Sequence, residues 1–590
     1  MQNTKIIYKF PFRILIIFPA LILGFLLWKY GVNCPFMDEW DTPGMDLVQF
    51  NLGELNFDRL IRQHNESRKL FPRLLFIYLS RNNWNPRSGM LISLLLSCLT
   101  TFNIYYLSKL TIKENTARRL AYLTLSSMLI FSPMQWENWL WGLQMITFIP
   151  IAAITSSLVI IYTQNPMVVK LLASAVLATC ATFSFANGII SWVVIFPALY
   201  LVAGKNGRLA WVTTGWLLLF SLNVAVYFHD YHRPAQHPSL IDALGKPIQS
   251  IAYYLSFLGS PLGIHQLWLN QAIGLGICLL IAFSYWYLLQ INRDRSQDKL
   301  WNEHLIERLF PWLTILGYTF ISGALTTAGR VGFGVDQSLA SRYVTFSTYG
   351  LVSLIYIVAM ILEEGDRSDD FSDKTIKNHR KTAKYSASIA LALILLLYPI
   401  NFTRGVRAMK VTYQNRLYGK SCLTLINVVP DRDCIENYIY PNFDSVLQRV
   451  NELDRIGLIQ PSLVLSDRLE NISRDSFSQI NYGSFESLTL DEDNSYNASG
   501  WSILPQYNAP AHAVVLAFQT ADLVHHAFAI AKPESNRKDL RQIRDNRHIG
   551  WEKSFPQRLI PDEAISLSAW SFDSNLARAY QLGELKHTIE

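Results

Sequence analysis

The stretch LIIFPALILGFLLWKYG, residues 15 to 31, is apolar enough to lie inside a lipid bilayer, and PFMDEWDTPG follows it at residues 35 to 44. The second stretch places three carboxylates, Asp38, Glu39 and Asp41, only a few residues beyond the apolar run. A helix needs about 17 to 25 apolar residues to cross roughly 30 Å of hydrocarbon. The two stretches together predict a membrane-spanning helix that leads into an acidic loop.

The rest of the chain extends this pattern. Of its 590 residues, 50% are apolar and only 16% are charged, which is too apolar a composition for an ordinary soluble protein. Apolar runs of membrane-spanning length recur as far as residue 402 and then stop. The sequence therefore predicts a mainly α polytopic membrane protein with eleven transmembrane helices, near residues 12–30, 88–108, 119–132, 139–162, 168–186, 188–204, 209–228, 268–290, 309–327, 343–363 and 385–402.

Lysine and arginine in the short loops indicate the orientation. These residues mark cytoplasmic loops, and they fall on one side of the membrane if the N-terminus is cytoplasmic. This parity requires residues 248–263 to lie in the interface or to re-enter rather than cross. We therefore expect a multi-pass protein of the plasma membrane. The net charge of +7 then reflects topology, and no nucleic-acid partner is expected.

The C-terminal part has a different periodicity. HAVVLAFQTADLVHHAFAIAK (512–532) and AISLSAWSFD (564–573) alternate apolar and polar residues, as strands do. We expect a transmembrane domain at 1–402 with a first outer loop at 31–87. A mixed or helical connector is expected at 403–475 and a β-sandwich at 476–590, both periplasmic or extracellular.

Two features of this outer part have alternative interpretations. Trp501, Trp551 and Trp570 could form a face that stacks on sugars, although core aromatic residues of a small sandwich are the more economical explanation. Cys422 and Cys434 would lie in an oxidising compartment, where they could pair, but their spacing alone does not establish a disulfide.

Chemistry-bearing residues gather in the loops expected on the outer side. Ionisable groups at membrane depth cost roughly 2.5 to 3.5 kcal/mol each on insertion scales, so several of them in one layer indicate a functional site. Partly desolvated carboxylates there suit a general base or a divalent cation. The loops are DEWD (38–41), QHNESRKLFPR (63–73), QWENW (135–139), FANG (185–188), FHDYHRPAQHP (228–238) and AGRVGFGVDQSLASRY (328–343).

Each motif also has a structural interpretation. The DEWD acids could cap helices, with Asp41 or Thr42 as N-cap. The segment at 63–73 could bend to aim His64 and Glu66 into a cavity, or form an interfacial amphipathic helix. Arginines near a membrane surface suit a lipid phosphate, or they snorkel to headgroups. The tryptophans of QWENW fit an aromatic belt, whereas Glu137 between them does not.

The chain resembles a known superfamily in these motifs. MDEWD, QHNESRKLFPRLL, FSPMQWENWLWGLQ, TFSFANGI and SRYVTFSTY resemble a branch of bacterial membrane proteins assigned to the polytopic glycosyltransferases of the C superfamily, which use polyprenyl-phosphate sugars. That superfamily carries an acid-x-acid or single Asp motif in the first outer loop, where Glu39-Trp40-Asp41 or Asp38 lies here. The resemblance covers residues 12 to 402.

The resemblance implies an inverting transfer of a sugar from a polyprenyl-phosphate donor to a hydroxyl of a glycan, lipid or protein acceptor at the outer face. The expected catalytic residues are Asp38, Glu39, Asp41 and Glu66, with Asp38 or Asp41 as the first choice for the base. The expected substrate-binding residues are His64, Arg68, Arg73, Trp136, Glu137, Asn138, Asn187, Arg330, Arg342 and Tyr343.

The sequence leaves the cofactor and the exact reaction open. No cofactor is required, although Glu39 and Asp41 could hold a divalent cation, magnesium or manganese. The chain lacks a strict Asp-x-Asp at this point. The alternatives are a polysaccharide polymerase or ligase with a lipid-pyrophosphate donor, a transporter of lipid-linked glycans, and a non-catalytic scaffold that presents the sandwich.

Overall fold

A computed structural model describes residues 9–81, 83–113, 116–205, 207–234, 238, 240–294, 299–366, 374–473, 482–540 and 547–586. The chain divides into two compact units. Unit 1 comprises Met1–Gly31, Asn56–Leu75 and Arg87–Met409, and unit 2 comprises Val32–Leu55, Phe76–Pro86 and Lys410–Glu590. The expected first outer loop at 31–87 therefore contributes segments to both units.

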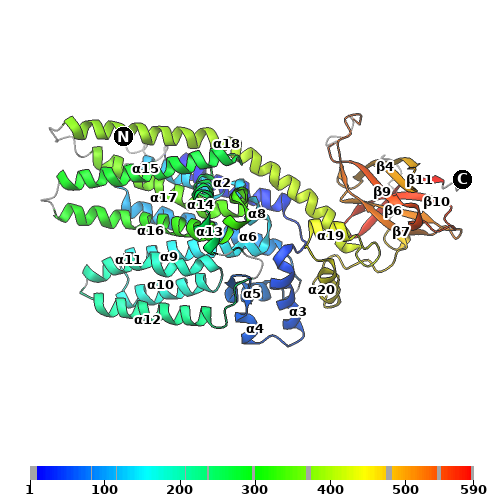
Figure 1. The fold of residues 1–590 in the computed structure, drawn as a ribbon, viewed down its shortest axis with the longest axis horizontal. Helices are drawn as coiled ribbons and strands as arrows, with labels where there is room; N and C mark the ends of the chain where they lie inside the picture. The colour runs from blue at the N-terminus through cyan, green and yellow to red at the C-terminus, as the bar shows by residue number, and fades with distance from the viewer. Residues whose placement is uncertain are drawn as a thin grey trace. The chain divides into compact units, whose positions relative to one another are not determined.

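Unit 1 is helical, and its long helices run side by side (Figure 1). They are α2 (Lys9–Tyr30), α6 (Arg87–Thr111), α7 (Thr116–Ile130), α9 (Ile149–Tyr162), α10 (Met167–Thr182), α11 (Ile190–Lys205), α12 (Leu209–Phe228), α15 (Leu267–Asp294), α16 (Lys299–Arg330), α17 (Ser341–Asp366) and α18 (Lys374–Thr424), which belongs to unit 1 as far as Met409. Because these runs are apolar on every side, burial in protein or in lipid is what stabilises them.

Within the part of the chain that the structure describes, eight helices are long and apolar enough to cross a membrane. Their ranges are Arg87–Thr111, Gly142–Tyr162, Ala186–Lys205, Leu209–Phe228, Leu267–Tyr287, Leu305–Phe333, Ser341–Glu363 and Lys384–Thr424. Two further predicted spans are shorter apolar helices, Ile14–Tyr30 and Met167–Thr182. The span predicted at 119–132 lies in the 15-residue α7, so the count of eleven is not confirmed.

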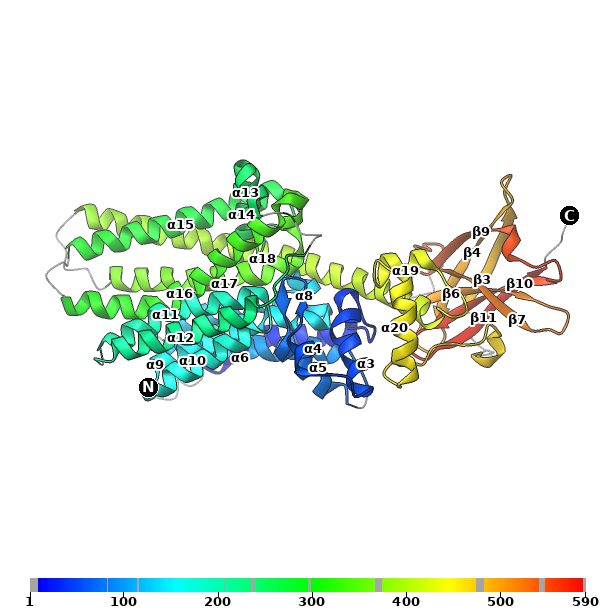
Figure 2. The same cartoon turned by 60° about the horizontal axis from the view of Figure 1, so that its bottom comes forward.

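Short elements gather at one end of the unit 1 bundle. Figures 1 and 2 both show α4, α5, α8, α13 and α14 at this end. The elements are α4 (Phe57–Ile61), β1 (Gln63–His64), β2 (Ser67–Arg68), α5 (Leu70–Leu79), η3 (Pro133–Gln135), α8 (Trp136–Leu140), η4 (Gly142–Thr147), η5 (Ala186–Ile189), α13 (Leu240–Gly245), α14 (Pro247–Gly259), η6 (Val331–Phe333) and η7 (Val335–Leu339).

The helix α14 occupies the segment for which the sequence left two possibilities. Its 13 residues rise roughly 20 Å, which is too short to cross about 30 Å of hydrocarbon. A Cβ at Gly274 would stand 1.9 Å from the carbonyl oxygen of Leu255, so only glycine lets α15 approach α14 this closely. The geometry agrees with the expectation that residues 248–263 do not cross the membrane as a helix.

The first part of unit 2 is a small helical layer. It contains η1 (Met37–Trp40), η2 (Asp41–Met45), α3 (Asp46–Asn51), the end of α18, α19 (Arg432–Tyr438), α20 (Phe443–Arg455) and η8 (Leu469–Asn471). Trp40 is fully buried in its core. A disulfide joins Cys422 to Cys434 with 6.4 Å between the Cα atoms, and it ties α18 to α19. The pairing that the sequence left undecided is therefore formed.

The second part of unit 2 consists of two antiparallel sheets with strand orders β11-β10-β6-β7 and β3-β4-β9-β8, the latter with β5 paired to β4 (Figure 2). The strands are β3 (Gly483–Leu490), β4 (Ser495–Leu504), β5 (Ala509–Pro510), β6 (Ala513–Gln519), β7 (His525–Ala531), β8 (Pro533–Ser535), β9 (Gly550–Pro556), β10 (Ser566–Asp573) and β11 (Arg578–Lys586), with η9 (Gln557–Leu559) after β9. The C-terminal β region is therefore as predicted.

The three tryptophans of the sheets lie inside them. Trp501, Trp551 and Trp570 are 4%, 2% and 5% exposed. A ring that stacks on a sugar must present a face to solvent, so the sugar-stacking interpretation is wrong. These residues are core aromatics, because the indole rings lie among the apolar side chains of the two sheets.

Candidate functional site

The segment QHNESR forms a tight hairpin in unit 1. β1 and β2 pair antiparallel, with Gln63 opposite Arg68 and His64 opposite Ser67. Asn65 at the tip has φ 51°, a left-handed conformation that asparagine tolerates better than most residues. The amphipathic-helix interpretation is therefore wrong for residues 63–68, and the turn exposes Glu66 instead.

Arg68 and Arg73 hold the loops around this hairpin. Arg68 donates to the carbonyl of Tyr227 at 2.7 Å, to that of Ile61 at 3.0 Å and to that of His229. Arg73 donates to backbone carbonyls at the end of α4, at 2.6 to 3.2 Å. Carbonyls at helix ends lack intrahelical partners, so these bonds satisfy them. The hydrogen bonds of both arginines therefore stabilise the conformation of these loops rather than a bound substrate.

His64 is held in its neutral form. Burial, together with the charges of Lys69 and Arg73, lowers the pKa of the imidazole to about 2. Its Nδ1 lies 3.1 Å from the Nζ of Lys69, which is itself buried. His64 therefore accepts a hydrogen bond from an ammonium group at neutral pH, and it does not act as a cation toward phosphate.

The hairpin presents Glu66 to Arg330 at the end of α16. The Nη2 of Arg330 lies 2.6 Å from the Oε1 of Glu66, and the two side chains are 23% and 34% exposed. The backbone carbonyl of Glu66 accepts a hydrogen bond from the Tyr227 hydroxyl at 2.7 Å. The carboxylate thus lies at a fixed position on the surface of the bundle end.

A second acid–arginine pair forms between α8 and the start of α17. The Oε1 of Glu137 lies 3.3 Å from Nη1 of Arg342, and its Oε2 accepts from the Arg342 backbone N–H at 3.0 Å and from Ser341 Oγ at 2.8 Å. The amide of Asn138 donates to the carbonyl of Arg342 and to Thr345. The expected residues Glu137, Asn138 and Arg342 therefore meet, with Asn138 acting as a fully buried brace.

The aromatic residues of this loop do not form a belt. Trp139 is fully buried, and its Nε1 donates to the carbonyl of Ser132 at 2.9 Å. Trp136 is half-buried. The belt interpretation is wrong for Trp139, because its ring supports the loop from inside the bundle.

Two tyrosines connect the two arginines. Burial raises the pKa of the Tyr253 phenol above its ordinary value, Tyr343 raises it further, and Arg330 and Arg342 both lower it. The guanidinium of Arg342 also lies over the Tyr343 ring, 5.3 Å from its centroid. The helix α14, which carries Tyr253, packs against α16 and α17, which carry Arg330 and Arg342, so the two arginines lie around one phenol. We call Glu66, Glu137, Tyr253, Arg330, Arg342 and Tyr343 the arginine cluster.

The predicted turn at Asn187 lies against the hairpin. The backbone N–H of Ala186 donates to Ser67 Oγ at 3.1 Å, and Phe185 stacks on Phe346 of α17. A Cβ at Gly188 would stand 1.9 Å from the carbonyl oxygen of Ala181, so this turn requires glycine. Asn187 itself is half-buried in η5, which makes turn chemistry a sufficient explanation for it.

The acids of DEWD belong to unit 2 and are engaged there. Glu39 is 1% exposed and accepts the backbone N–H of Phe36 at 2.9 Å. Arg449 approaches one oxygen of Asp41 at 2.8 Å, and the Tyr440 hydroxyl donates to the other at 3.2 Å. Asp38 is half-buried in η1.

The helix-capping interpretation holds for Glu39, whose carboxylate accepts the N-cap N–H of η1, but neither Asp41 nor Thr42 is an N-cap. The N-cap of α3 is Met45, and that of η2 is Trp40, neither with a side-chain cap. Glu39 closes the turn before it, and Asp41 ties the segment to α20. The two carboxylates thus have anchoring partners of their own.

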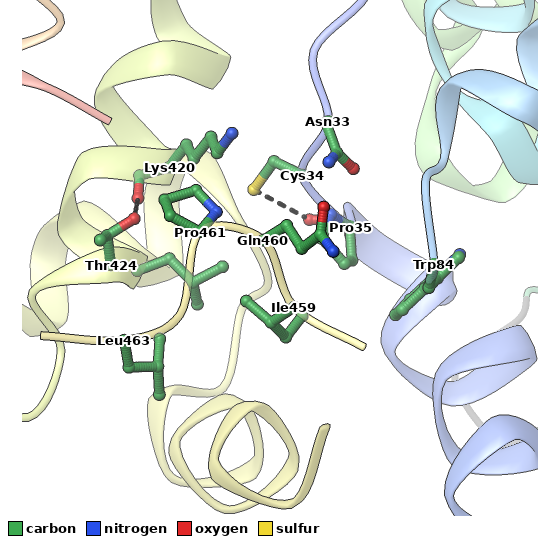
Figure 3. A pocket seen from close by; sticks show the side chains of 11 residues that line it. Asn33, Cys34, Pro35, Trp84, Lys420, Thr424, Ile459, Gln460, Pro461 and Leu463 are labelled. Atoms are coloured by element: carbon green, nitrogen blue, oxygen red, sulfur yellow. Dashed lines mark hydrogen bonds between the residues drawn. The ribbon is translucent and has the colours of Figure 1, made fainter. Parts of the chain in front are cut away.

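Beside this segment lies a cavity lined by Cys34, Lys420, Thr424 and Gln460 (Figure 3). Its volume is about 10 Å³, which admits at most one water. Burial raises the pKa of the Cys34 thiol to about 12, so the thiol is neutral and unreactive at neutral pH. This cavity cannot accommodate a sugar.

The expected cation ligands do not fit a metal. Both oxygens of Asp41 have donors, and Glu39 bonds to the backbone. Across the described residues no three His, Cys, Asp or Glu side chains converge as a metal-binding group. The binding of a divalent cation by Glu39 and Asp41 therefore stays a prediction from the sequence.

No family model, no curated protein and no solved structure matches the chain. The site is therefore interpreted from its own geometry. In chemical terms, unit 1 is a helical bundle with candidate membrane spans, and it carries two arginines paired with glutamates at one end.

Proposed function

We propose that the chain is an integral membrane glycosyltransferase that moves a sugar from a polyprenyl-phosphate donor to an acceptor hydroxyl at the outer face of the membrane. One observation carries the proposal: Arg330 and Arg342, each paired with a glutamate, lie on helices that pack against the helix of Tyr253 at the end of an apolar bundle. Several ionisable groups beside the hydrocarbon are unfavourable, so their convergence indicates a function.

The arginine cluster suits a lipid-linked phosphate. Guanidinium groups bind phosphate through two parallel hydrogen bonds. As the bond between the sugar and the phosphate breaks, negative charge grows on the departing phosphate. Two arginines fixed in advance stabilise this charge without reorganising, which lowers the barrier.

Glu66 is the base in this mechanism. In the structure its carboxylate is paired with Arg330. A bound phosphate would compete for that guanidinium, and a carboxylate that loses its cation becomes more basic. Donor binding would thereby activate Glu66 to take the proton of the acceptor hydroxyl, which attacks C1 of the sugar and inverts it. Asp41, one of the two first choices from the sequence beside Asp38, instead has Arg449 and Tyr440 as partners.

Membership of the C superfamily, eleven crossings and a cytoplasmic N-terminus form part of this proposal. The disulfide between Cys422 and Cys434 supports an outer location for unit 2, because structural disulfides persist in oxidising compartments. The acceptor would then be a component of the cell envelope.

A transfer assay tests the proposal. Membranes that contain the chain would be incubated with labelled polyprenyl-phosphate hexoses and pentoses and with cell-envelope glycan. We expect the wild type to transfer label and Glu66→Gln to be about 10² to 10⁴-fold slower. Glu307→Gln is the matched control, because Glu307 is also a half-buried glutamate in an ion pair, with Lys205. Equal rates for the two variants would contradict the role of Glu66.

A polysaccharide polymerase or ligase with a lipid-pyrophosphate donor is the second candidate. It is favoured by the engagement of the DEWD acids in unit 2, since such an enzyme relies on arginines rather than on those acids. Loss of transfer in Arg330→Gln, together with full activity in Glu66→Gln and Asp41→Asn, would identify this function.

A further inference from the structure

Unit 1 contains an open cavity of about 560 Å³ that the arginine cluster does not include. One wall is the hairpin and the end of α4, with Arg62, Gln63 and Arg68, and the other is the segment after α12, with His229, His232 and Arg233. Its volume lies within the range of small-ligand sites, roughly 300 to 1,000 Å³. The cavity is thus large enough for a short oligosaccharide.

The two walls are joined before any ligand binds. The side-chain amide of Gln63 donates to the carbonyl of His232 at 2.6 Å and accepts from its backbone N–H at 3.0 Å. Arg68 bonds to the carbonyls of Tyr227 and His229 and so fixes the same segment. A preformed cavity loses little conformational freedom on binding, which favours a specific ligand.

The lining carries more positive than negative side chains. Three arginines face the cavity, with two aspartates, Asp58 and Asp230. The imidazole of His229 lies 3.2 Å from the carboxylate of Asp230. The guanidinium of Arg68 keeps its positive charge while its N–H groups bond to carbonyls. The arginines suit a carboxylate or phosphate group.

The hairpin places this cavity next to the proposed base. Gln63, Asn65 and Arg68 line the cavity, while Glu66 of the same turn pairs with Arg330 of the arginine cluster. A hydroxyl of a molecule in the cavity would lie beside Glu66 without entering the donor phosphate site.

We propose that this cavity binds an acidic saccharide, and that Arg62 and Arg233 recognise its carboxylate or phosphate group. Its use as the acceptor site rests on the proposed function, whereas the binding itself does not.

Equilibrium binding tests the proposal without any donor. The full chain in phosphatidylcholine nanodiscs would be titrated with digalacturonate and with the neutral digalactose. We expect Arg62→Ala/Arg233→Ala to bind digalacturonate at least about tenfold more weakly than the wild type, because a charge-assisted contact is lost. Arg208→Ala/Lys381→Ala is the control, because it removes two exposed charges elsewhere in unit 1 and should bind like the wild type.

The proposal is wrong if the wild type does not bind digalacturonate, if it binds digalactose equally well, or if Arg62→Ala/Arg233→Ala binds digalacturonate as tightly as the wild type. Loss of binding when phosphatidylglycerol replaces phosphatidylcholine would assign the cavity to a lipid headgroup and would also overturn it. If neither the wild type nor any variant transfers sugar, the proposed enzymatic activity is wrong, but the binding result is still valid.

Discussion

The two units each contain an acid–arginine pair, and the pairs are nearly identical in geometry. Glu66 and Arg330 of unit 1 lie 2.6 Å apart, with side chains 34% and 23% exposed. Asp41 and Arg449 of unit 2 lie 2.8 Å apart, with side chains 33% and 21% exposed. Neither distance nor exposure therefore distinguishes a functional pair from a structural one.

The surroundings of the two pairs differ. In unit 1 a second arginine, Arg342, and two tyrosines join the pair, and they come from helices far apart in sequence. In unit 2 the second oxygen of Asp41 is bound by Tyr440, whose ring lies near the same Arg449. The comparison teaches that the convergence of a second acid–arginine pair and of tyrosines on the first pair, rather than the ion pair itself, marks a place for an anionic ligand.

The largest expected difference between the pairs is catalytic. We expect Arg330→Gln to lower the rate of sugar transfer by about 10² to 10³, because it removes a preorganised cation from the departing phosphate. Arg449→Gln should change the rate only a few-fold, since Arg449 anchors a segment of unit 2. The measurement is the transfer rate of both variants at equal amounts of protein. A larger loss in Arg449→Gln would reverse the assignment of the two units.

The disulfide of unit 2 gives the largest expected effect on stability. Cys422→Ala opens a loop of about a dozen residues and should lower the free energy of unfolding by about 3 kcal/mol, because the unfolded chain regains freedom. Calorimetry of the full chain would show the transition of unit 2 at a lower temperature and that of unit 1 unchanged. Cys98→Ala, which removes an exposed free cysteine of unit 1, is the control. Equal shifts in both variants would argue against the disulfide.

The pH dependence should also separate the units. Burial, together with the charge of Lys420, lowers the pKa of His512 from an ordinary 6.5 to about 3. Below about pH 6.5 the unfolded chain binds a proton that the folded chain does not, so stability falls as pH falls from 6.5 toward 3. Between pH 6.5 and about pH 5 this contribution amounts to about 2 kcal/mol.

A neighbouring carboxyl group acts in the opposite direction. Burial raises the pKa of Asp573, so this group contributes stability that is lost as pH rises through its folded pKa. Replacing the imidazole isolates the histidine contribution. His512→Gln should flatten the acid side of the stability curve of unit 2, measured by calorimetry at a series of pH values, and His548→Gln should not. An unchanged curve in His512→Gln would contradict the buried neutral histidine.

The smallest expected effect concerns Asp41. Asp41→Asn removes an ion pair that is about a third exposed, and it should lower the stability of unit 2 by about 1 kcal/mol. A double-mutant cycle with Arg449→Gln measures this coupling. Transfer activity should remain within a few-fold of the wild type. Loss of activity with intact stability would return the role of base to Asp41 and would weaken the distinction between the units.

Much of the fold follows from the sequence, and the exceptions have physical causes. Long apolar runs predict helices wherever they exceed membrane thickness, but Met167–Thr182 and α7 fall short of that length, so their crossing is not decided by composition. The alternation of residue types after residue 482 marks the sheets, because successive side chains of a strand point to opposite faces, although both faces of β10 are buried. Trp501, Trp551 and Trp570 are core residues, as large aromatic residues of a small sandwich usually are.

The candidate site was less predictable. The loops that carry it were evident from their ionisable residues, but the pairing of Glu66 with Arg330 joins residues 264 positions apart. No local pattern encodes such a pair. Tyr253 was missed, because an aromatic residue in an apolar run near the interface gives no signal. Asn65 in QHNESR was the available sign of a turn, and it would have indicated the hairpin.

The binding of a polyprenyl phosphate, without a sugar, tests the central claim most directly. Its affinity for the purified chain in nanodiscs would be compared among the wild type, Arg330→Gln/Arg342→Gln and Arg449→Gln. We expect the double variant to bind the polyprenyl phosphate at least about tenfold more weakly than the wild type, and Arg449→Gln to bind it like the wild type. Equal affinity in the wild type and the double variant would contradict the assignment of the arginine cluster to the donor phosphate.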